Sequence, residues 1–243
     1  MTPPVFLIDA LPDGDTAVLS GPEGHHAATV RRIVQGERVW LADGAGGIAE
    51  CDVASAVPER LELIVVRRAV LDPPDPAVVV AQAVPKGDRG ELAVELMTEL
   101  GVDEIIPWAA ARCVAKWRGD RVVKHVTRWR GAARTAAKQA RRAFVPTVTD
   151  PVGTRALCAR VAAATSAVVL HEAATTPLVS LPLPTSGELL LVVGPEGGLS
   201  DGEITVLRAA GAQLARLGSP VLRTSTAGAA ALAAVSTPLG RWP

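Results

Sequence analysis

A proline-rich run, Leu71-Asp-Pro-Pro-Asp-Pro76, constrains the fold of this chain more than any other feature. Three prolines in four positions do not fit inside a helix or a central strand, because proline has no amide hydrogen to donate and its ring clashes with the preceding turn. We therefore expect a domain boundary here, with one domain over residues 1–72 and another over residues 73–243. A chain of 243 residues is long enough for two domains.

The spacing of apolar residues changes across this boundary. Before it, short apolar runs are separated by turn residues, a pattern typical of a small β-barrel or sandwich. After it, the apolar run Ala77–Val84 indicates a strand buried on both faces, and strands then alternate with helices, which predicts an α/β fold with a mainly parallel sheet. The first of these helices places Leu92, Leu96 and Leu100 on one apolar stripe. We expect strands at residues 5–8, 17–19, 38–41, 48–53, 61–66, 77–84, 102–107, 166–170, 188–193 and 213–217, and helices at residues 25–34, 88–100, 121–140, 153–163, 200–210 and 224–235.

The charge of the chain is unevenly distributed. Lys+Arg and Asp+Glu are 25 each, so the net charge is zero. Between Arg112 and Arg142, eleven basic residues and one acid give a net charge of +10, which leaves −10 for the remainder. Such a segment in a neutral protein is a candidate polyanion site, and its Trp117 and Trp129 can stack on bases or pack internally. A solvated helix face is the alternative, but the density of cations favours nucleic acid.

Several classes of protein are excluded by features that the sequence lacks. The longest wholly apolar stretch, Ala227–Val235, is too short to cross a bilayer, and we expect no signal peptide. The three cysteines form no CxxC pair and the histidines have no metal-site spacing, so we expect reduced thiols, no metal and a cytoplasmic location. The glycine fingerprints of dinucleotide-binding and P-loop proteins are also missing.

Three strand ends carry the residues that suggest a ligand site. A buried strand runs into Gly194-Pro-Glu-Gly-Gly-Leu199 and then a helix, and Leu217–Thr226 again joins a strand to a helix. Glycine lets a ligand approach the backbone, and ligands of open α/β sheets bind at the carboxyl ends of strands. A tight turn is the alternative for the first loop. Arg223 lies near a helix start, where a cation is unfavourable, and so indicates an anionic partner. The strand end Leu170-His-Glu172 completes the group.

Taken together, the motifs resemble the small-subunit ribosomal RNA uridine-N3 methyltransferases of the knotted SPOUT superfamily. The resemblance covers nearly the whole chain, and the order and spacing of its pieces are specific. The chain departs from the family's last loop at Pro220 and Ser225, where arginine and glutamate are usual. The pieces that match are His25-His, Val30-Arg-Arg, Asp43-Gly, Pro85-Lys-Gly-Asp, Thr98–Pro107, Arg128-Trp129, Gln139, Arg142, Val145-Pro146, Gly194–Leu199, Leu217-Gly and Val221–Thr224.

The resemblance implies a PUA-like, RNA-binding β-barrel followed by a SPOUT-type α/β domain with a trefoil knot. It also implies S-adenosylmethionine as cofactor, a homodimer, and N3-methyluridine in the 16S rRNA of the small ribosomal subunit as product. Two alternatives stay open. One is a related SPOUT enzyme that methylates a ribose 2′-hydroxyl of rRNA or tRNA, and the other is a non-catalytic RNA-binding or ribosome-assembly protein.

Roles for individual residues follow from the same resemblance. Arg223 is the preferred catalytic candidate, because a guanidinium near O2 or O4 of uracil would stabilise the developing anion. Glu196 and His171 are candidates for the general base. The residues expected at the cofactor are Leu170, His171, Glu172, Gly194, Pro195, Glu196, Gly197, Gly198, Leu217, Gly218, Ser219, Val221, Leu222 and Thr224. Those expected to contact RNA are Arg31, Arg32, Lys86, Arg112, Lys116, Arg128, Arg141 and Arg142.

Overall fold

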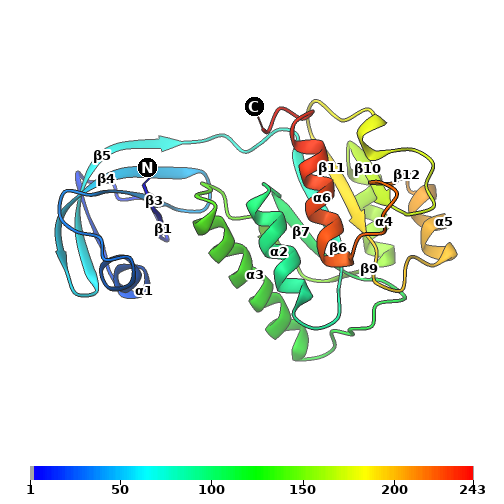
Figure 1. The fold of residues 1–243 in the computed structure, drawn as a ribbon, viewed down its shortest axis with the longest axis horizontal. Coiled ribbons are helices and arrows are strands. Elements are labelled where there is room, and N and C mark those ends of the chain that lie inside the picture. The colour runs from blue at the N-terminus through cyan, green and yellow to red at the C-terminus, as the bar shows by residue number, and fades with distance from the viewer. Residues whose placement is uncertain (1–2, 243) are drawn as a thin grey trace. The chain divides into compact units, whose positions relative to one another are not determined.

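The computed structural model describes residues 3–242, which fall into two compact units (Figure 1). The first runs to Pro73 and includes the returning segment Ala137–Val145, and the second comprises Pro74–Ala136 and the residues from Pro146 onward. In the part of the chain that is described, no helix is both long and apolar enough to cross a membrane.

The returning segment Ala137–Val145 corrects the division expected from the sequence, which assigned all residues from 73 onward to the second domain. Its amide at Val145 donates to the carbonyl oxygen of Gly44 at 2.9 Å, and Lys138 forms an ion pair of 2.9 Å with Glu23. Sequence reading missed this return because these partners lie about a hundred positions away along the chain.

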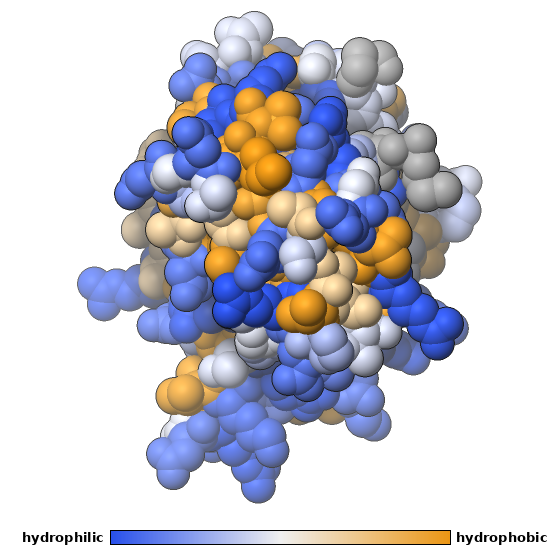
Figure 2. Space-filling view, turned by 90° about the vertical axis from the view of Figure 1, so that its left-hand side faces the viewer, coloured by the Kyte–Doolittle hydropathy of each residue, from blue (hydrophilic) through white to orange (hydrophobic). Residues whose placement is uncertain are grey.

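The first unit is a mixed sheet with strands in the order β1-β3-β4-β5-β2. β1 pairs parallel to β3, and the other pairs are antiparallel. The residues of β4 alternate between buried and partly exposed, as expected for a sheet with one face on a core. On the side of the molecule that Figure 2 shows, apolar patches lie among mostly hydrophilic residues. The strands are β1 (Val5–Leu7), β2 (Thr16–Leu19), β3 (Arg38–Ala42), β4 (Gly47–Val57) and β5 (Arg60–Val70).

A short helical segment of this unit differs from the expected helix at residues 25–34. Helix α1 (Gly21–His25) continues into a π-helical turn, His26–Val30, so the helical segment both begins and ends earlier. Pro22 favours the early start because its fixed φ suits the first turn of a helix. Arg32, with φ at 53°, ends the helical path.

The second unit is built on a parallel sheet with strands in the order β12-β10-β11-β6-β7-β8, to which β9 adds beside β7. Strand β6 is buried on both faces, as its continuous apolar run predicts. The strands are β6 (Ala77–Ala83), β7 (Glu104–Ala109), β8 (Thr147–Val148), β9 (Val152–Gly153), β10 (Ser166–Leu170), β11 (Glu188–Val193) and β12 (Gln213–Ala215).

Helices cover both faces of this sheet (Figure 1). Val78 and Val80 of β6 pack with α2, α3, α6 and a 3₁₀ turn (Leu178–Ser180), whereas Val79 and Ala81 pack with α4 and α5. This alternation follows from the period-two geometry of a strand. The helices are α2 (Arg89–Glu99), α3 (Arg121–Gln139), α4 (Thr154–Ala163), α5 (Asp201–Ala209) and α6 (Thr224–Ser236).

The buried face of α2 is not the leucine stripe expected from the sequence. Leu92 is 46% exposed, whereas Val94 and Met97 are fully buried. The reason is the close approach of α6, which has a glycine at the contact: a Cβ on Gly228 would lie 2.6 Å from the sulfur of Met97. Small residues on one helix thus select which face of its neighbour is buried.

Candidate active site

Loops at the carboxyl edge of the second sheet enclose a cavity of about 540 Å³. They follow β10, β11 and β12, and the loop after β6 lies at the same edge. Because these strands are parallel, their carboxyl ends lie at the same edge of the sheet. Open α/β sheets bind ligands at this edge. The volume lies within the range of small-ligand sites, about 300–1,000 Å³.

The residues predicted to bind the cofactor line this cavity, with the exception of Ser219. The imidazole of His171 accepts a hydrogen bond at Nδ1 from the amide of Ala173, at 3.2 Å, which fixes its orientation. Two cations of the cavity wall were missed by sequence reasoning, Arg89 on α2 and Arg216 after β12. Arg216 directly follows β12, at the edge of the sheet that the glycine loops mark, and Arg89 is the first residue of α2, after the loop that follows β6.

The glycine-rich loop after β11 needs glycine for its own folding. A Cβ on Gly194 would lie 3.1 Å from the side chain of Leu199, and one on Gly197 would lie 3.1 Å from the Cβ of Arg112. Gly198 has φ at 69°, a conformation that side chains disfavour, and open space lies where its Cβ would point. The loop therefore packs tightly at two positions and leaves room for a ligand at the third.

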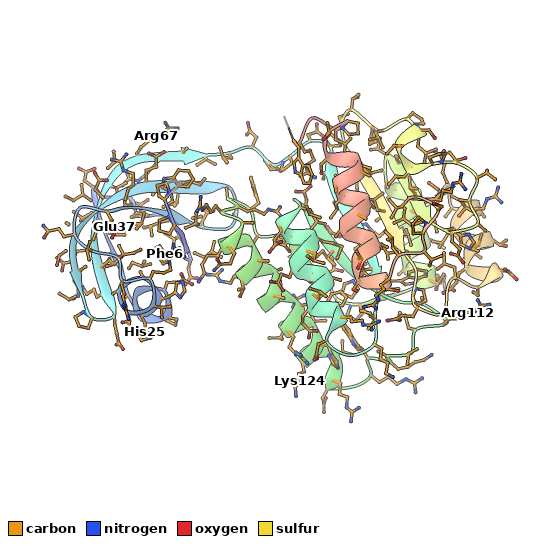
Figure 3. All side chains as sticks on the ribbon, in the orientation of Figure 1. Phe6, His25, Glu37, Arg67, Arg112 and Lys124 are labelled. Atoms are coloured by element: carbon orange, nitrogen blue, oxygen red, sulfur yellow. The ribbon has the colours of Figure 1, made fainter. Side chains whose placement is uncertain are left out.

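Arg112, which was predicted to contact RNA, also holds this loop in place. Its Nη1 donates to the carbonyl oxygens of Gly197 at 3.3 Å and Leu199 at 3.2 Å (Figure 3 labels Arg112). An RNA contact by Arg112 stays a prediction, whereas its contact with the cavity loop is a property of the fold.

A buried carboxylate, Glu203 on α5, joins the segment before Arg112 to the end of the glycine-rich loop. It accepts hydrogen bonds from the amide of Ala111 (2.8 Å), the amide and hydroxyl of Ser200 (3.0 and 2.8 Å), and the hydroxyl of Thr154 (3.3 Å). Burial alone would raise the pKa of Glu203, but these hydrogen bonds outweigh burial and lower it. Ser200 and Glu203 form a capping box at the start of α5, and the bond from Ala111 links that box to the residue preceding Arg112.

Comparison with known proteins identifies the family. The model of an RNA methyltransferase domain matches residues 73–236, and that of an RNA methyltransferase PUA domain matches residues 19–66. The ribosomal RNA small subunit methyltransferase E of Mycobacterium bovis is 49% identical over 98% of this chain and 93% of its own length. The chain belongs to the ribosomal RNA small subunit methyltransferase E family. The family expected from the sequence is thereby confirmed, and so is its arrangement of a PUA domain followed by an α/β RNA methyltransferase domain.

More distant members of the methyltransferase E family agree. The Bacillus subtilis protein of that name is 33% identical, with 92% of this chain and 91% of its own length covered. A crystal structure of the Neisseria gonorrhoeae protein of that name, bound to S-adenosyl methionine, is 28% identical and superposes with a TM-score of 0.85 over 98% of each chain. The expectation that the chain is an RNA methyltransferase is therefore also confirmed.

Both catalytic candidates of this methyltransferase line the cavity. Arg223 precedes the first residue of α6, is exposed, and has no side-chain hydrogen bond or ion pair within residues 3–242. Glu196 lies on the glycine-rich loop, and its carboxylate accepts a hydrogen bond of 3.1 Å from the amide of Lys86. The bond ties the loop after β11 to the loop after β6.

The predicted RNA contacts fall into two groups. The guanidinium of Arg128 is paired with Glu91 at 2.8 Å and Asp88 at 3.4 Å, so it holds α2 against α3. Arg142 is partly buried in the first unit. Arg112 and Arg128 are exposed but bonded within the second unit, and the other exposed members are Arg31, Arg32 and Arg141 in the first unit and Lys86 and Lys116 in the second. Among residues 3–242, no cluster of three or more His, Cys, Asp or Glu is arranged to hold a metal ion.

Proposed function

We propose that this protein transfers a methyl group from S-adenosylmethionine to N3 of a uridine in the 16S rRNA of the small ribosomal subunit. The observation that carries the proposal is the cavity at the converging ends of β10, β11 and β12, in a chain of this methyltransferase family. The PUA-like unit and the exposed cations of the second unit supply further contacts to structured RNA.

The residues of the cavity fit S-adenosylmethionine. Leu170 and Val193 offer apolar surface to an adenine ring, Arg216 offers a cation to the cofactor's carboxylate, and Glu172 offers a carboxylate to its ammonium. The open space at Gly198 lets a ligand reach the backbone. The bound cofactor supplies an electrophilic methyl group on a sulfonium centre, so the protein has mainly to position the uridine and stabilise charge.

Methylation at N3 requires the uracil imide to lose its proton and to form a bond to the methyl carbon, while the bond from that carbon to the sulfonium sulfur breaks and the neutral thioether leaves. Charge then builds on the uracil oxygens, and we assign Arg223 to stabilise it, helped by the positive end of the α6 dipole. We assign Glu196 to accept the proton, because the Lys86 amide holds its carboxylate at the mouth of the cavity. The remaining cofactor contacts and RNA contacts are those predicted from the sequence.

Three further properties belong to the proposal. We expect the trefoil knot that the resemblance implies, with Leu170–Glu172, Gly194–Leu199 and Leu217–Thr224 as its loops. We expect a homodimer, which sedimentation in solution will test. We expect a cytoplasmic location, because bacterial ribosomal subunits are assembled there.

The deciding experiment is methyl transfer from labelled S-adenosylmethionine to small subunits that lack native modification, followed by nucleoside analysis. Labelled N3-methyluridine supports the proposal. Label in a 2′-O-methylated nucleoside supports the ribose alternative. The absence of both methyl transfer and cofactor binding would support the non-catalytic RNA-binding alternative.

A further inference from the structure

A second cavity of about 290 Å³ lies beside the loop that follows β6. Its walls combine aromatic rings with cations, since Trp117, His125 and Trp129 line it together with Lys116 and Arg121. These residues come from α3 and from the segment between β7 and α3, and all belong to the second unit. Neither the cofactor cavity nor the catalytic candidates include them.

The aromatic side chains form an ordered stack. The rings of Trp117 and His125 are nearly parallel, 6° apart in orientation, with centroids separated by 4.9 Å. Trp129 meets Trp117 edge to face at 5.1 Å and is buried, and Gly90 leaves room for its indole. Trp117 and His125 are only partly buried. The pair is therefore a braced aromatic platform at the surface, to which a further flat ring can add.

The charges around the platform suit a polyanion that carries flat rings. Lys116 and Arg121 are exposed and have no ion pair among the described residues. The carboxylates of Asp88 and Glu91 also line the cavity, but both are paired with Arg128. Cations beside an aromatic platform are the combination with which proteins bind single-stranded nucleic acid.

A third hollow, of about 600 Å³, shares lining residues with both the second cavity and the cofactor cavity. Gly87 and Asp88 line both the aromatic cavity and this hollow, and Arg89 and Glu196 line both the hollow and the cofactor cavity. A strand of RNA whose target base reaches the cofactor through the hollow therefore brings a neighbouring nucleotide to the platform.

We propose that the Trp117–His125 platform binds the unpaired base of a nucleotide next to the target uridine, with Lys116 and Arg121 contacting the adjoining phosphates. The inference rests on the proposed methyltransferase function and adds a specific subsite to it. It assigns Trp117, which sequence reasoning left between stacking and internal packing, to base stacking, and Trp129 to bracing.

The test uses the full chain and His125→Ala, because His125 is the outer, partly exposed partner, whereas Trp117 also packs against both apolar cores. Stacking of one base contributes about 1–3 kcal/mol, or roughly 5- to 150-fold in affinity. We expect kcat/KM for undermethylated small subunits to fall at least fivefold, through KM, with cofactor affinity unchanged. Trp117→Phe, which keeps an aromatic ring, should retain most of the wild-type value.

A binding measurement separates stacking from charge. We expect His125→Ala to bind a uridine oligonucleotide more weakly than wild type, and an abasic ribose-phosphate chain of the same length equally well. Equal weakening for both probes, or no weakening for either, would overturn the inference. If wild type methylates subunits while His125→Ala matches its kcat/KM, the platform fails and the methyltransferase function stands; if wild type transfers no methyl group, the function itself fails.

Discussion

Replacing Glu203 by glutamine tests whether its buried carboxylate holds the loops of the cofactor cavity. The amide has nearly the same shape, so no void forms, but one acceptor oxygen becomes an NH₂ donor. In the wild type, Oε1 accepts from the amide of Ala111 and Oε2 accepts from the amide of Ser200. Whichever way the new amide turns, one of these two backbone N–H groups loses its acceptor.

The cost follows from this loss. A buried donor left without a partner destabilises a protein by about 1–3 kcal/mol, and the remaining bonds lose the assistance of a full negative charge. We therefore expect Glu203→Gln to lower the free energy of unfolding at pH 7 by about 2 kcal/mol. Because Ala111 precedes Arg112, which holds the glycine-rich loop, the affinity for S-adenosylmethionine should fall as well.

The difference between wild type and Glu203→Gln should also depend on pH. Burial raises the pKa of Glu203, but the hydrogen bonds from Ala111, Ser200 and Thr154 outweigh it, so the folded pKa lies below the ordinary value of 4.5. A carboxyl group whose pKa is lowered by folding stabilises the protein above its unfolded pKa, and this contribution is lost as the pH falls through the folded pKa. The difference should therefore be full at pH 7 and shrink below pH 4.5.

Urea denaturation at pH 7 and at a series of acid pH values provides the measurement. Glu95→Gln is the matched control, because Glu95 is exposed on α2 and makes no side-chain hydrogen bond among the described residues. Its removal changes the net charge equally and should alter the free energy of unfolding by less than about 0.5 kcal/mol. Equal stability of the two variants at pH 7, or a difference that persists unchanged into the acid range, would contradict the role assigned to the Glu203 carboxylate.

Three other perturbations test separate parts of the molecule. Arg223→Ala should lower the rate of methyl transfer to subunits about 10²- to 10³-fold at saturating cofactor, and a full rate would remove Arg223 from the mechanism. Gly90→Ala places a Cβ 2.6 Å from the indole nitrogen of Trp129 and should cost roughly 1–3 kcal/mol in denaturation, whereas wild-type stability would show that the indole has room to move. Lys124 lies on the exposed face of α3 (Figure 3), and Lys124→Gln should reduce the slope of log affinity for RNA against log salt concentration by about 0.7–0.9. Arg130 is already paired with Asp150, so Arg130→Gln should leave this slope unchanged. Equal slopes for the two variants would contradict the assignment.

The central strands of the second unit were predictable from local pattern because they are short, mostly apolar and bounded by polar or glycine residues. The expected bounds of β10 and β11, Ser166–Leu170 and Glu188–Val193, are those observed. Errors arose where distant contacts decide the outcome. The buried face of α2 depends on Gly228 of α6, and the segment Ala137–Val145 packs with strands and loops far away in sequence.

The candidate site was predictable to a similar extent. Glycine loops at strand ends marked the cavity, because sheet topology brings the ends of parallel strands together whatever the intervening sequence. The hydrogen bonds that hold the cavity loops in place were not predictable. They join Ala111 and Arg112 to Glu203 and to the glycine-rich loop, which are distant in sequence and meet only in the folded chain. Arg89 was overlooked because it lies at the start of α2, beyond the loop that follows β6, and not at the strand end itself.

Some cations of the basic segment Arg112–Arg142 stabilise the fold, and others are exposed and free to contact RNA. Arg128 and Arg130 form ion pairs within the second unit, so their charges are partly neutralised before any RNA arrives, and Arg112 is held by backbone carbonyl oxygens. Lys116 and Lys124 stay exposed and unpaired within residues 3–242. The field that an RNA strand meets is therefore set by a few cations near the platform and the outer face of α3. Because surface charges more than about 10 Å apart are screened at moderate salt, this local arrangement, and not the net charge of zero, determines RNA binding.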